Sequence, residues 1–253
     1  MAKTQTPMVF APTGSRIKAL FNGETLAESD NAMLFRESPF KLFYFFPKDD
    51  VNHDLLVESD HVEESGLRGR REHWHIEAGD RRVENGAFAY VEEKENRPDL
   101  RAYVGIEMAA PDAWFEEDEE LIGHPRDPYT RIDVRRSARH IRVAINGTTV
   151  AETNRALILY ETGLVRRYYI PKDDVHTHLF TPTATHTICP YKGEARYWSF
   201  KEGDVRDVVW AYDDPFDDAA RVQGTMCFYQ ERDEVSIYVD GELEETAPAF
   251  FTK

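Results

Sequence analysis

Apolar and polar residues alternate along short segments of this chain, and several of these segments end at a turn sequence. Residues 141–145 alternate, Asn146 and Gly147 follow, and the alternation resumes at residue 149. An Asn-Gly pair between two alternating segments is typical of a β-hairpin with a two-residue type I′ turn. Residues 16–26, which contain Asn22 and Gly23, have the same pattern. The sequence therefore predicts a hairpin at each place.

Other short segments also favour strands. Residues 156–160 and 167–170 are rich in branched and aromatic side chains, which suit a pleated sheet. Residues 235–239 alternate and precede an Asp-Gly pair, which predicts a late strand and turn. Pro47 and Pro171 each precede Lys-Asp-Asp-Val. A proline followed by acidic residues is a helix-start signal, so we expect a short helix after each.

The chain contains the same domain twice. Residues 16–56 align with residues 140–180 without a gap, at an offset of 124, and 15 of these 41 positions are identical. The same offset places Gly69 on Gly193 and Trp74 on Trp198. A period this long exceeds any solenoid unit, so each copy should have its own core. We predict a mainly β protein of two tandem compact domains, each with one or two short helices.

The proline-rich segment 125–130 marks the expected boundary between the copies. We expect an N-terminal extension over residues 1–15 and a first repeat domain over 16–124. A linker over 125–138 and a second repeat domain over 139–253 complete the chain.

Composition narrows the function classes. The formal net charge of −16 repels phosphate backbones, so we expect no nucleic-acid partner. No segment approaches the roughly 18 apolar residues that a membrane span needs, so we expect no membrane partner. Two cysteines are too few for a disulfide framework, which suits the cytoplasm. The sequence indicates no cofactor and leaves the oligomeric state open.

Residues 185–198 combine groups that bear chemistry around one proline and one glycine. Cys189 could act as a thiolate nucleophile, with Lys192 lowering its pKa and His186 as its base. Tyr191, Tyr197 and Trp198 would then form aromatic walls for a small ligand. The alternative is a small buried cysteine in a packed turn, because free cysteine is among the most buried residue types.

The first copy differs at this corner. Cys189 aligns with Ser65, Tyr191 with Leu67, Lys192 with Arg68 and Tyr197 with His73, whereas the glycine and the tryptophan are unchanged. A corner required only by the fold should be kept in both copies. This difference favours one competent site, in the second domain, beside a degenerate first copy.

Three further features are candidates. Glu161, at the end of a predicted strand, could carry a proton or form a salt bridge. Arg167 could meet an anionic ligand beside Tyr169, or could be exposed on an edge strand. His176, His178, His186 and Cys189 lie within fourteen residues, and such ligands suit zinc, but their spacing fits no standard zinc signature. We therefore assign no metal ligands, and surface histidines explain the cluster as well.

The second copy resembles the domain of unknown function 427 family over residues 139–242. The resemblance is carried in order by Asn146-Gly147, Val150–Thr153, Glu161, Tyr168–Pro171, Asp174-Val175, Cys189–Gly193, Ala195, Tyr197-Trp198, Trp210–Tyr212, Pro215 and Phe228-Tyr229. The resemblance implies a compact, mostly β domain. The family carries a nucleotidyltransferase-like label in some domain collections, without an established activity. The sequence gives this label little support, since no two aspartates are separated by one residue and no P-loop is present.

These observations predict a cytosolic tandem-domain protein that binds a small ligand, anionic or aromatic, at the Cys-Pro-Tyr-Lys-Gly corner of the second domain. A thiol-dependent enzyme using Cys189 is one alternative. A structural or interaction module without a catalytic site is the other.

Overall fold

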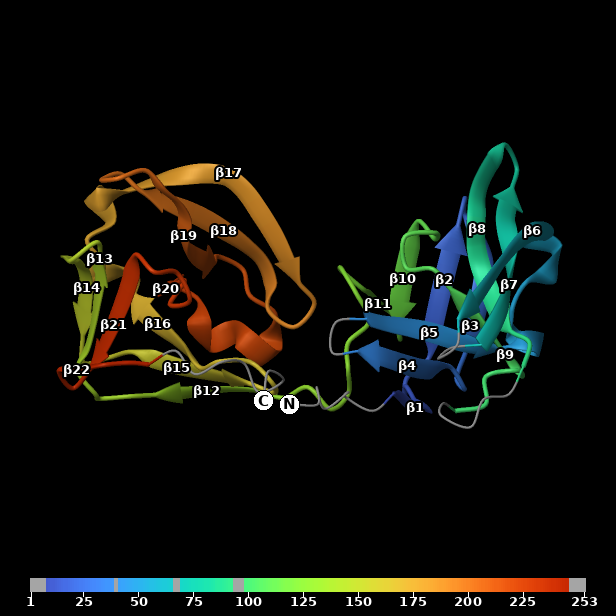
Figure 1. Ribbon diagram of the computed structural model, residues 1–253, viewed down its shortest axis with the longest axis horizontal. Coiled ribbons are helices and arrows are strands. Elements are labelled where there is room, and N and C mark those ends of the chain that lie inside the picture. The colour runs from blue at the N-terminus through green and yellow to red at the C-terminus, as the bar shows by residue number, and fades with distance from the viewer. Residues whose placement is uncertain (1–7, 39–40, 66–68, 93–97, 246–253) are drawn as a thin grey trace. The chain divides into compact units, whose positions relative to one another are not determined.

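The computed structural model describes residues 8–38, 41–65, 69–92 and 98–245. The chain divides into two compact units, Met1–Asp127 and Pro128–Lys253. Each unit consists of one seven-stranded and one four-stranded antiparallel sheet (Figure 1). The expectation of two mainly β domains in tandem is confirmed.

In the first domain the large sheet has the order β1-β4-β5-β9-β8-β7-β6, and the small sheet has the order β11-β10-β2-β3. The strands are β1 (Val9–Pro12), β2 (Ile17–Phe21), β3 (Glu24–Ser29), β4 (Met33–Ser38), β5 (Lys41–Pro47), β6 (Leu56–Ser65), β7 (Gly69–Ala78), β8 (Arg81–Tyr90), β9 (Tyr103–Ile106), β10 (Ala113–Glu116) and β11 (Glu119–Glu120).

The second domain repeats this topology. Its large sheet has the order β12-β15-β16-β20-β19-β18-β17, and its small sheet has the order β14-β13-β21-β22. The strands are β12 (Ile132–Arg136), β13 (Ile141–Ile145), β14 (Thr148–Thr153), β15 (Leu157–Glu161), β16 (Arg167–Pro171), β17 (Phe180–Cys189), β18 (Gly193–Phe200), β19 (Val205–Tyr212), β20 (Thr225–Phe228), β21 (Val235–Val239) and β22 (Glu242–Leu243).

Each domain begins earlier than its first hairpin. Strand β1 pairs with β4, although its residues lie in the segment assigned to the N-terminal extension. Strand β12 pairs with β15, although its residues lie in the segment assigned to the linker. Both are single edge strands without a hairpin turn before them, so local pattern gives no signal that they belong to a sheet.

The predicted hairpins form. Asn22 and Gly23 have φ angles of +50° and +81°, and Asn146 and Gly147 have φ angles of +49° and +82°. Two consecutive residues with positive φ are what a type I′ turn requires. β2 pairs with β3, and β13 pairs with β14, on either side of these turns.

The short helices after Pro47 and Pro171 form as single 3₁₀ turns, η1 (Lys48–Asp50) and η3 (Lys172–Asp174). The last aspartate of each turn accepts a hydrogen bond from a hydroxyl at the end of a small-sheet strand. Ser29 at the end of β3 donates to Asp50, and Thr153 at the end of β14 donates to Asp174, both at 2.5 Å. The shared Lys-Asp-Asp motif therefore serves the fold. The structure adds η2 (His53–Leu55), η4 (Thr177–Leu179) and η5 (Asp217–Val222).

Each large sheet is apolar on both faces. In the second domain, one face packs against the small sheet through fully buried side chains such as Val143 on β13 and Phe228 on β20. The other face carries a second cluster that includes Tyr169, Trp210 and Cys227, and it packs against η5. Figure 1 shows η5, coloured orange-red, inside the curve of this sheet. Because each buried large apolar side chain contributes about 1.5–3 kcal/mol, both faces stabilise the domain.

Candidate functional site

The Cys-Pro-Tyr-Lys-Gly corner is the turn of the β17–β18 hairpin. Cys189 pairs with Gly193 at the end of the ladder, and the Lys192 amide donates to the Cys189 carbonyl at 3.1 Å. Gly193 has a φ of +99°, a region that residues with a side chain rarely adopt. The turn is therefore built from proline and glycine for backbone reasons that do not depend on a ligand.

Lys192 and Glu161 form a buried ion pair at this corner. The Lys192 Nζ atom donates to the Glu161 carboxylate at 2.6 Å, and each side chain is only 10% exposed. The pair joins the hairpin turn to the end of β15. In the first domain Glu37 instead lies 3.2 Å from Lys41, while Leu67 and Arg68 lie outside the described residues. The buried cation of the corner is thus engaged by a carboxylate.

Cys189 and His186 lie on opposite faces of β17. Side chains alternate along a strand, so residues three apart point to opposite sides. Cys189 packs with the second apolar cluster, whereas the His186 Nδ1 atom lies 2.5 Å from the exposed Glu194 carboxylate. The structure therefore does not bring the proposed base to the proposed nucleophile.

The two thiols provide a test of burial in this domain. Cys189 is half-buried and Cys227 is fully buried, and both are free. Burial raises the pKa of Cys227 to about 12, so its reactive thiolate is scarce at pH 8. We expect iodoacetamide to leave Cys227 unmodified in the folded protein at pH 8 and to modify it once urea unfolds the second domain. Mass spectrometry of tryptic peptides measures both; rapid labelling in the folded state would contradict the buried placement.

Tyr197 lies on the same face as Cys189 and takes part in a chain of hydroxyls. Its hydroxyl shares a hydrogen bond of 2.6 Å with Thr187 and lies 3.4 Å from the Tyr229 hydroxyl. The Tyr197 and Tyr229 rings are stacked, and the Trp210 ring lies 4.5 Å from Tyr229. Burial raises the pKa of Tyr229, so its hydroxyl stays protonated at neutral pH.

Arg167 and Tyr169 lie on β16 beside these rings. The Arg167 guanidinium is 5.3 Å from the centre of the Trp210 ring, and it donates to the Glu231 carboxylate at 2.6 Å. Trp210 donates to the Tyr169 hydroxyl at 3.4 Å. We call Thr187, Tyr197, Tyr229, Trp210 and Arg167 the hydroxyl–arginine cluster. It places hydrogen-bonding groups and the Arg167 guanidinium at the edge of an aromatic surface, and the Arg232 guanidinium lies 5.3 Å from the centre of the Tyr229 ring.

Two predicted ligand contacts lie elsewhere. Trp198 neighbours Tyr197 in sequence but points to the opposite face, where it packs against the main core and the Lys172 ammonium lies 5.9 Å from its ring. Tyr191 is buried in the hairpin turn. Tyr229 and Trp210 were not predicted as ligand contacts. Strand pairing could have indicated them, because residues 197 and 210 lie on the paired strands β18 and β19, and residue 229 directly follows β20.

The four residues considered for zinc do not converge. His176 and His178 have ring centres 6.0 Å apart, and His186 meets Glu194 instead. Within the described segments, one group of three potential metal ligands is found, and it lies in the first domain: His61, Glu63 and His73. This histidine–carboxylate cluster occupies the positions of Thr185, Thr187 and Tyr197 at the offset of 124.

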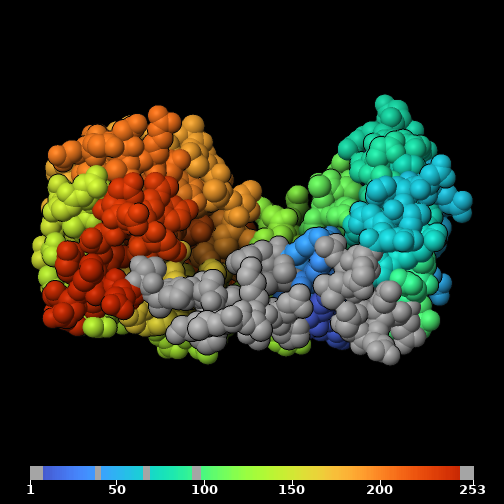
Figure 2. Space-filling model, in the orientation of Figure 1, coloured from blue at the N-terminus to red at the C-terminus, as the bar shows by residue number. Residues whose placement is uncertain are grey.

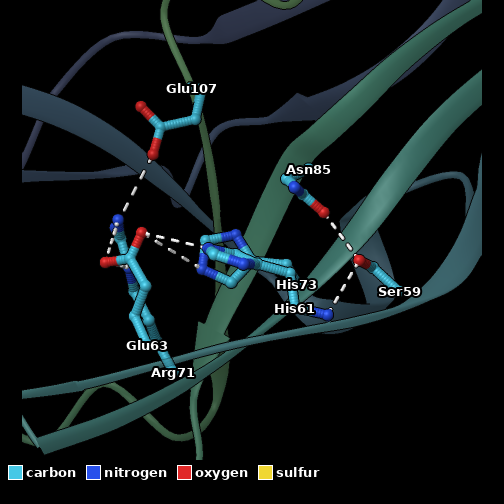
Figure 3. Close-up of polar contacts among 7 residues, drawn as sticks. All are labelled: Ser59, His61, Glu63, Arg71, His73, Asn85 and Glu107. Atoms are coloured by element: carbon cyan, nitrogen blue, oxygen red, sulfur yellow. Dashed lines mark hydrogen bonds and ion pairs between the residues drawn. The ribbon is translucent and has the colours of Figure 1, made fainter.

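The histidine–carboxylate cluster stands on the β6–β7 hairpin. Glu63 pairs with Arg71 in the ladder, so His61 and Glu63 on β6 and Arg71 and His73 on β7 share one face. Arg71 donates to the Glu63 carboxylate at 2.9 Å, and a guanidinium nitrogen lies 3.6 Å from Glu107 (Figure 3). The sequence signal for this arrangement is His-x-Glu before the turn and Arg-x-His after it.

Electrostatics sets the charge states of this cluster. The hydrogen bonds from Arg71 lower the pKa of Glu63 to about 2, so this carboxylate is ionised at neutral pH. Burial lowers the pKa of His73, which favours its neutral imidazole. The chemistry of the two domains therefore differs at equivalent places: ionised and imidazole groups in the first, hydroxyls in the second.

Family comparison agrees with the duplicated architecture. A family model described as Domain of unknown function (DUF427) matches residues 9–117 and again residues 133–243. The chain belongs to the DUF427 family. The two matches confirm the tandem duplication and include β1 and all of β12 except its first residue. A search among curated proteins finds no match. No helix within the described residues combines the length and apolar character needed to cross a membrane.

Proposed function

We propose that this DUF427 protein is a cytosolic binding protein whose second domain holds a small aromatic anion at the hydroxyl–arginine cluster. The observation that carries the proposal is the hydroxyl chain of Thr187, Tyr197 and Tyr229 beside the guanidinium of Arg167. Small-molecule sites are mostly apolar surfaces with a few polar groups placed to orient the ligand. The cluster has this composition.

Each group has a distinct part in this binding. The Tyr229 ring is half-buried between Tyr197 and Trp210, and the Arg232 guanidinium lies 5.3 Å from its centre, so a ligand would stack on the exposed part of this ring beside Arg232. Arg167, whose side chain is 19% exposed, exchanges its exposed partner Glu231 for the anionic group of the ligand. An arginine stacked on an indole ring keeps its charge and its fork of donors in one orientation.

The geometry supports binding rather than thiol chemistry. The two groups that would activate Cys189 are engaged elsewhere, Lys192 with Glu161 and His186 with Glu194.

Binding is tested with 1-anilinonaphthalene-8-sulfonate, a fluorescent aromatic anion. We expect saturable binding to the folded protein, weakened about tenfold by Arg167→Met because a charge-assisted hydrogen bond is lost. Tyr229→Phe should weaken binding by about threefold, since it removes one neutral hydrogen bond. Fluorescence titration measures both.

Arg142 provides the matched control. Its guanidinium lies 3.9 Å from the centre of the Tyr238 ring in the small sheet of the same domain, so Arg142→Met also removes an arginine stacked on an aromatic ring. We expect this variant to bind the probe as the unmodified protein does. Equal weakening by both arginine variants, or no saturable binding at all, would refute the proposed site.

A further inference from the structure

His73 is a buried histidine whose ring nitrogens have no well-formed hydrogen bond within the described residues. The residue is only 4% exposed, and the backbone of Asn85 is the one hydrogen-bonding group that influences its pKa. Buried polar side-chain atoms are nearly always satisfied, so each exception calls for an explanation. A neutral imidazole nitrogen without a proton is also the form that binds a metal ion.

The groups nearest to this imidazole are metal ligands. The Glu63 Oε1 atom lies 3.8 Å from His73 Nε2 and 3.5 Å from His61 Nε2. The two imidazole rings have centres 4.7 Å apart. Figure 3 shows the Glu63 carboxylate directed at both imidazoles, with Arg71 on its other side.

We propose that His61, Glu63 and His73 form a binding site for a divalent transition metal ion, with zinc as the best-matched ion. The three ligand atoms lie within 4.8 Å of one another. Zinc–nitrogen and zinc–oxygen bonds of about 2.0–2.1 Å in a tetrahedron place neighbouring ligand atoms about 3.4 Å apart. The remaining pair is the ring nitrogens of His61 and His73. The His61 side chain is 46% exposed, so it has room to rotate and bring these two nitrogens to this separation.

Arg71 and Glu107 position the carboxylate ligand. Arg71 donates to Glu63 Oε2 from two nitrogens, at 2.9 and 2.7 Å, which leaves Oε1 for the metal. Glu107 lies 3.6 Å from a third guanidinium nitrogen and holds the far side of Arg71. Outer partners of this kind orient the groups that ligate a metal.

The ligand set selects the kind of ion. Two imidazoles and one carboxylate suit zinc and its neighbours in the first transition series, whereas magnesium and calcium prefer sites made of oxygen alone. Three protein ligands leave at least one coordination position for water or another small ligand. Solvent can reach the site from the side of His61 and Glu63, which are both partly exposed, and β6 and β7, coloured cyan, lie at the surface of the first domain in Figure 2.

The second domain supplies the variants that test the site. Its residues at the three positions are Thr185, Thr187 and Tyr197, which form hydrogen bonds in the same fold. Replacing each first-domain ligand by its counterpart gives His61→Thr, Glu63→Thr and His73→Tyr. His61→Thr changes a side chain that is 46% exposed, so the first domain should stay folded in this variant even if His73→Tyr or the loss of the Glu63–Arg71 contact disturbs it.

The experiment is calorimetric titration of the full chain, without a histidine tag, with Zn²⁺ and then with Co²⁺ and Mg²⁺. We expect the calorimetric titration to give one Zn²⁺ per chain and no competition from Mg²⁺. The absorption spectrum of the Co²⁺-bound protein should show bands typical of low coordination number. His61→Thr and Glu63→Thr should each weaken Zn²⁺ binding at least tenfold.

A variant that removes two imidazoles from the second domain serves as the control. His176→Ala combined with His178→Ala removes the neighbouring pair of the second domain and should leave Zn²⁺ binding unchanged. The proposal fails if no stoichiometric Zn²⁺ binding occurs, if Mg²⁺ competes at equal concentration, or if only the His176/His178 variant loses binding. The proposed site for the aromatic anion lies in the second domain. The outcome of the Zn²⁺ titration, positive or negative, therefore does not decide whether that ligand binds.

Discussion

Lys192→Met should destabilise the second domain by about 3–5 kcal/mol. This range is typical when one partner of a buried ion pair is removed and the other charge is left behind. Lys192 and Glu161 are each 10% exposed and lie 2.6 Å apart, so the variant would leave the Glu161 carboxylate without this cation in a nearly dry place. With a urea dependence of about 2 kcal/mol per molar, the unfolding midpoint should fall by about 2 M.

Both cysteines lie in the second domain, so thiol labelling reports on its unfolding alone. The labelled fraction of Cys227 along a urea series therefore measures the change. Lys192→Met combined with Glu161→Leu is the control, because replacing both charges by apolar groups of similar size is often nearly neutral. A single variant as stable as the unmodified protein would show that the pair carries no net stability, and failure of the double variant to recover would assign the loss to packing of the Lys192 stem.

The fold was largely accessible from local sequence patterns. The Asn-Gly turns at residues 22 and 146 and the alternation around them predicted hairpins that the structure contains. The strands β1 and β12 were assigned to no domain from the sequence. Each is an edge strand without an adjoining hairpin turn or a clear alternation of apolar and polar residues, which are the patterns that indicate a strand. The helix η5 was also missed, because its first residues belong to an acidic segment, 213–218, that is equally typical of a turn.

The candidate sites were less accessible, because they depend on strand register and on which face a side chain occupies. His186 and Cys189 are three residues apart, and alternation alone separates them. Alternation likewise separates Tyr197 from Trp198. Conversely, His61 and His73 are twelve residues apart in sequence, yet their rings meet because β6 and β7 fold back on each other. Nearness in sequence was thus a poor guide within this hairpin.

The duplicated hairpin shows how one scaffold carries two chemistries. The first domain has Arg71 stacked on Phe88, with 4.4 Å from guanidinium to ring centre, and the second has Arg167 stacked on Trp210. Phe88 and Trp210 are equivalent, since they pair with the equivalent residues His73 and Tyr197. The two arginines come from different strands, β7 and β16. A cation over this ring is therefore common to both domains, although no aligned position reveals it.

Gly193→Ala should destabilise the second domain by about 3 kcal/mol, for two separable reasons. A side chain at a φ of +99° costs about 1–2 kcal/mol. In addition, a Cβ atom at this position would lie 3.1 Å from the Asp214 carbonyl oxygen. That segment cannot move away freely, because the Phe216 amide donates to the Lys192 carbonyl at 3.2 Å within the same corner.

Gly147→Ala separates the cost of the backbone angle from the cost of the close contact. Gly147 has a φ of +82°, and a Cβ atom there would meet nothing within 4 Å, so this variant should lose only the conformational part, about 1 kcal/mol. Cys227 labelling in urea measures both variants on the same scale. If the two variants lose equal stability, the contact with Asp214 contributes nothing and the glycine of the corner is explained by its backbone angle alone. A larger loss for Gly193→Ala assigns this glycine to close packing between the hairpin turn and the segment that follows β19, and thus to the fold rather than to a ligand.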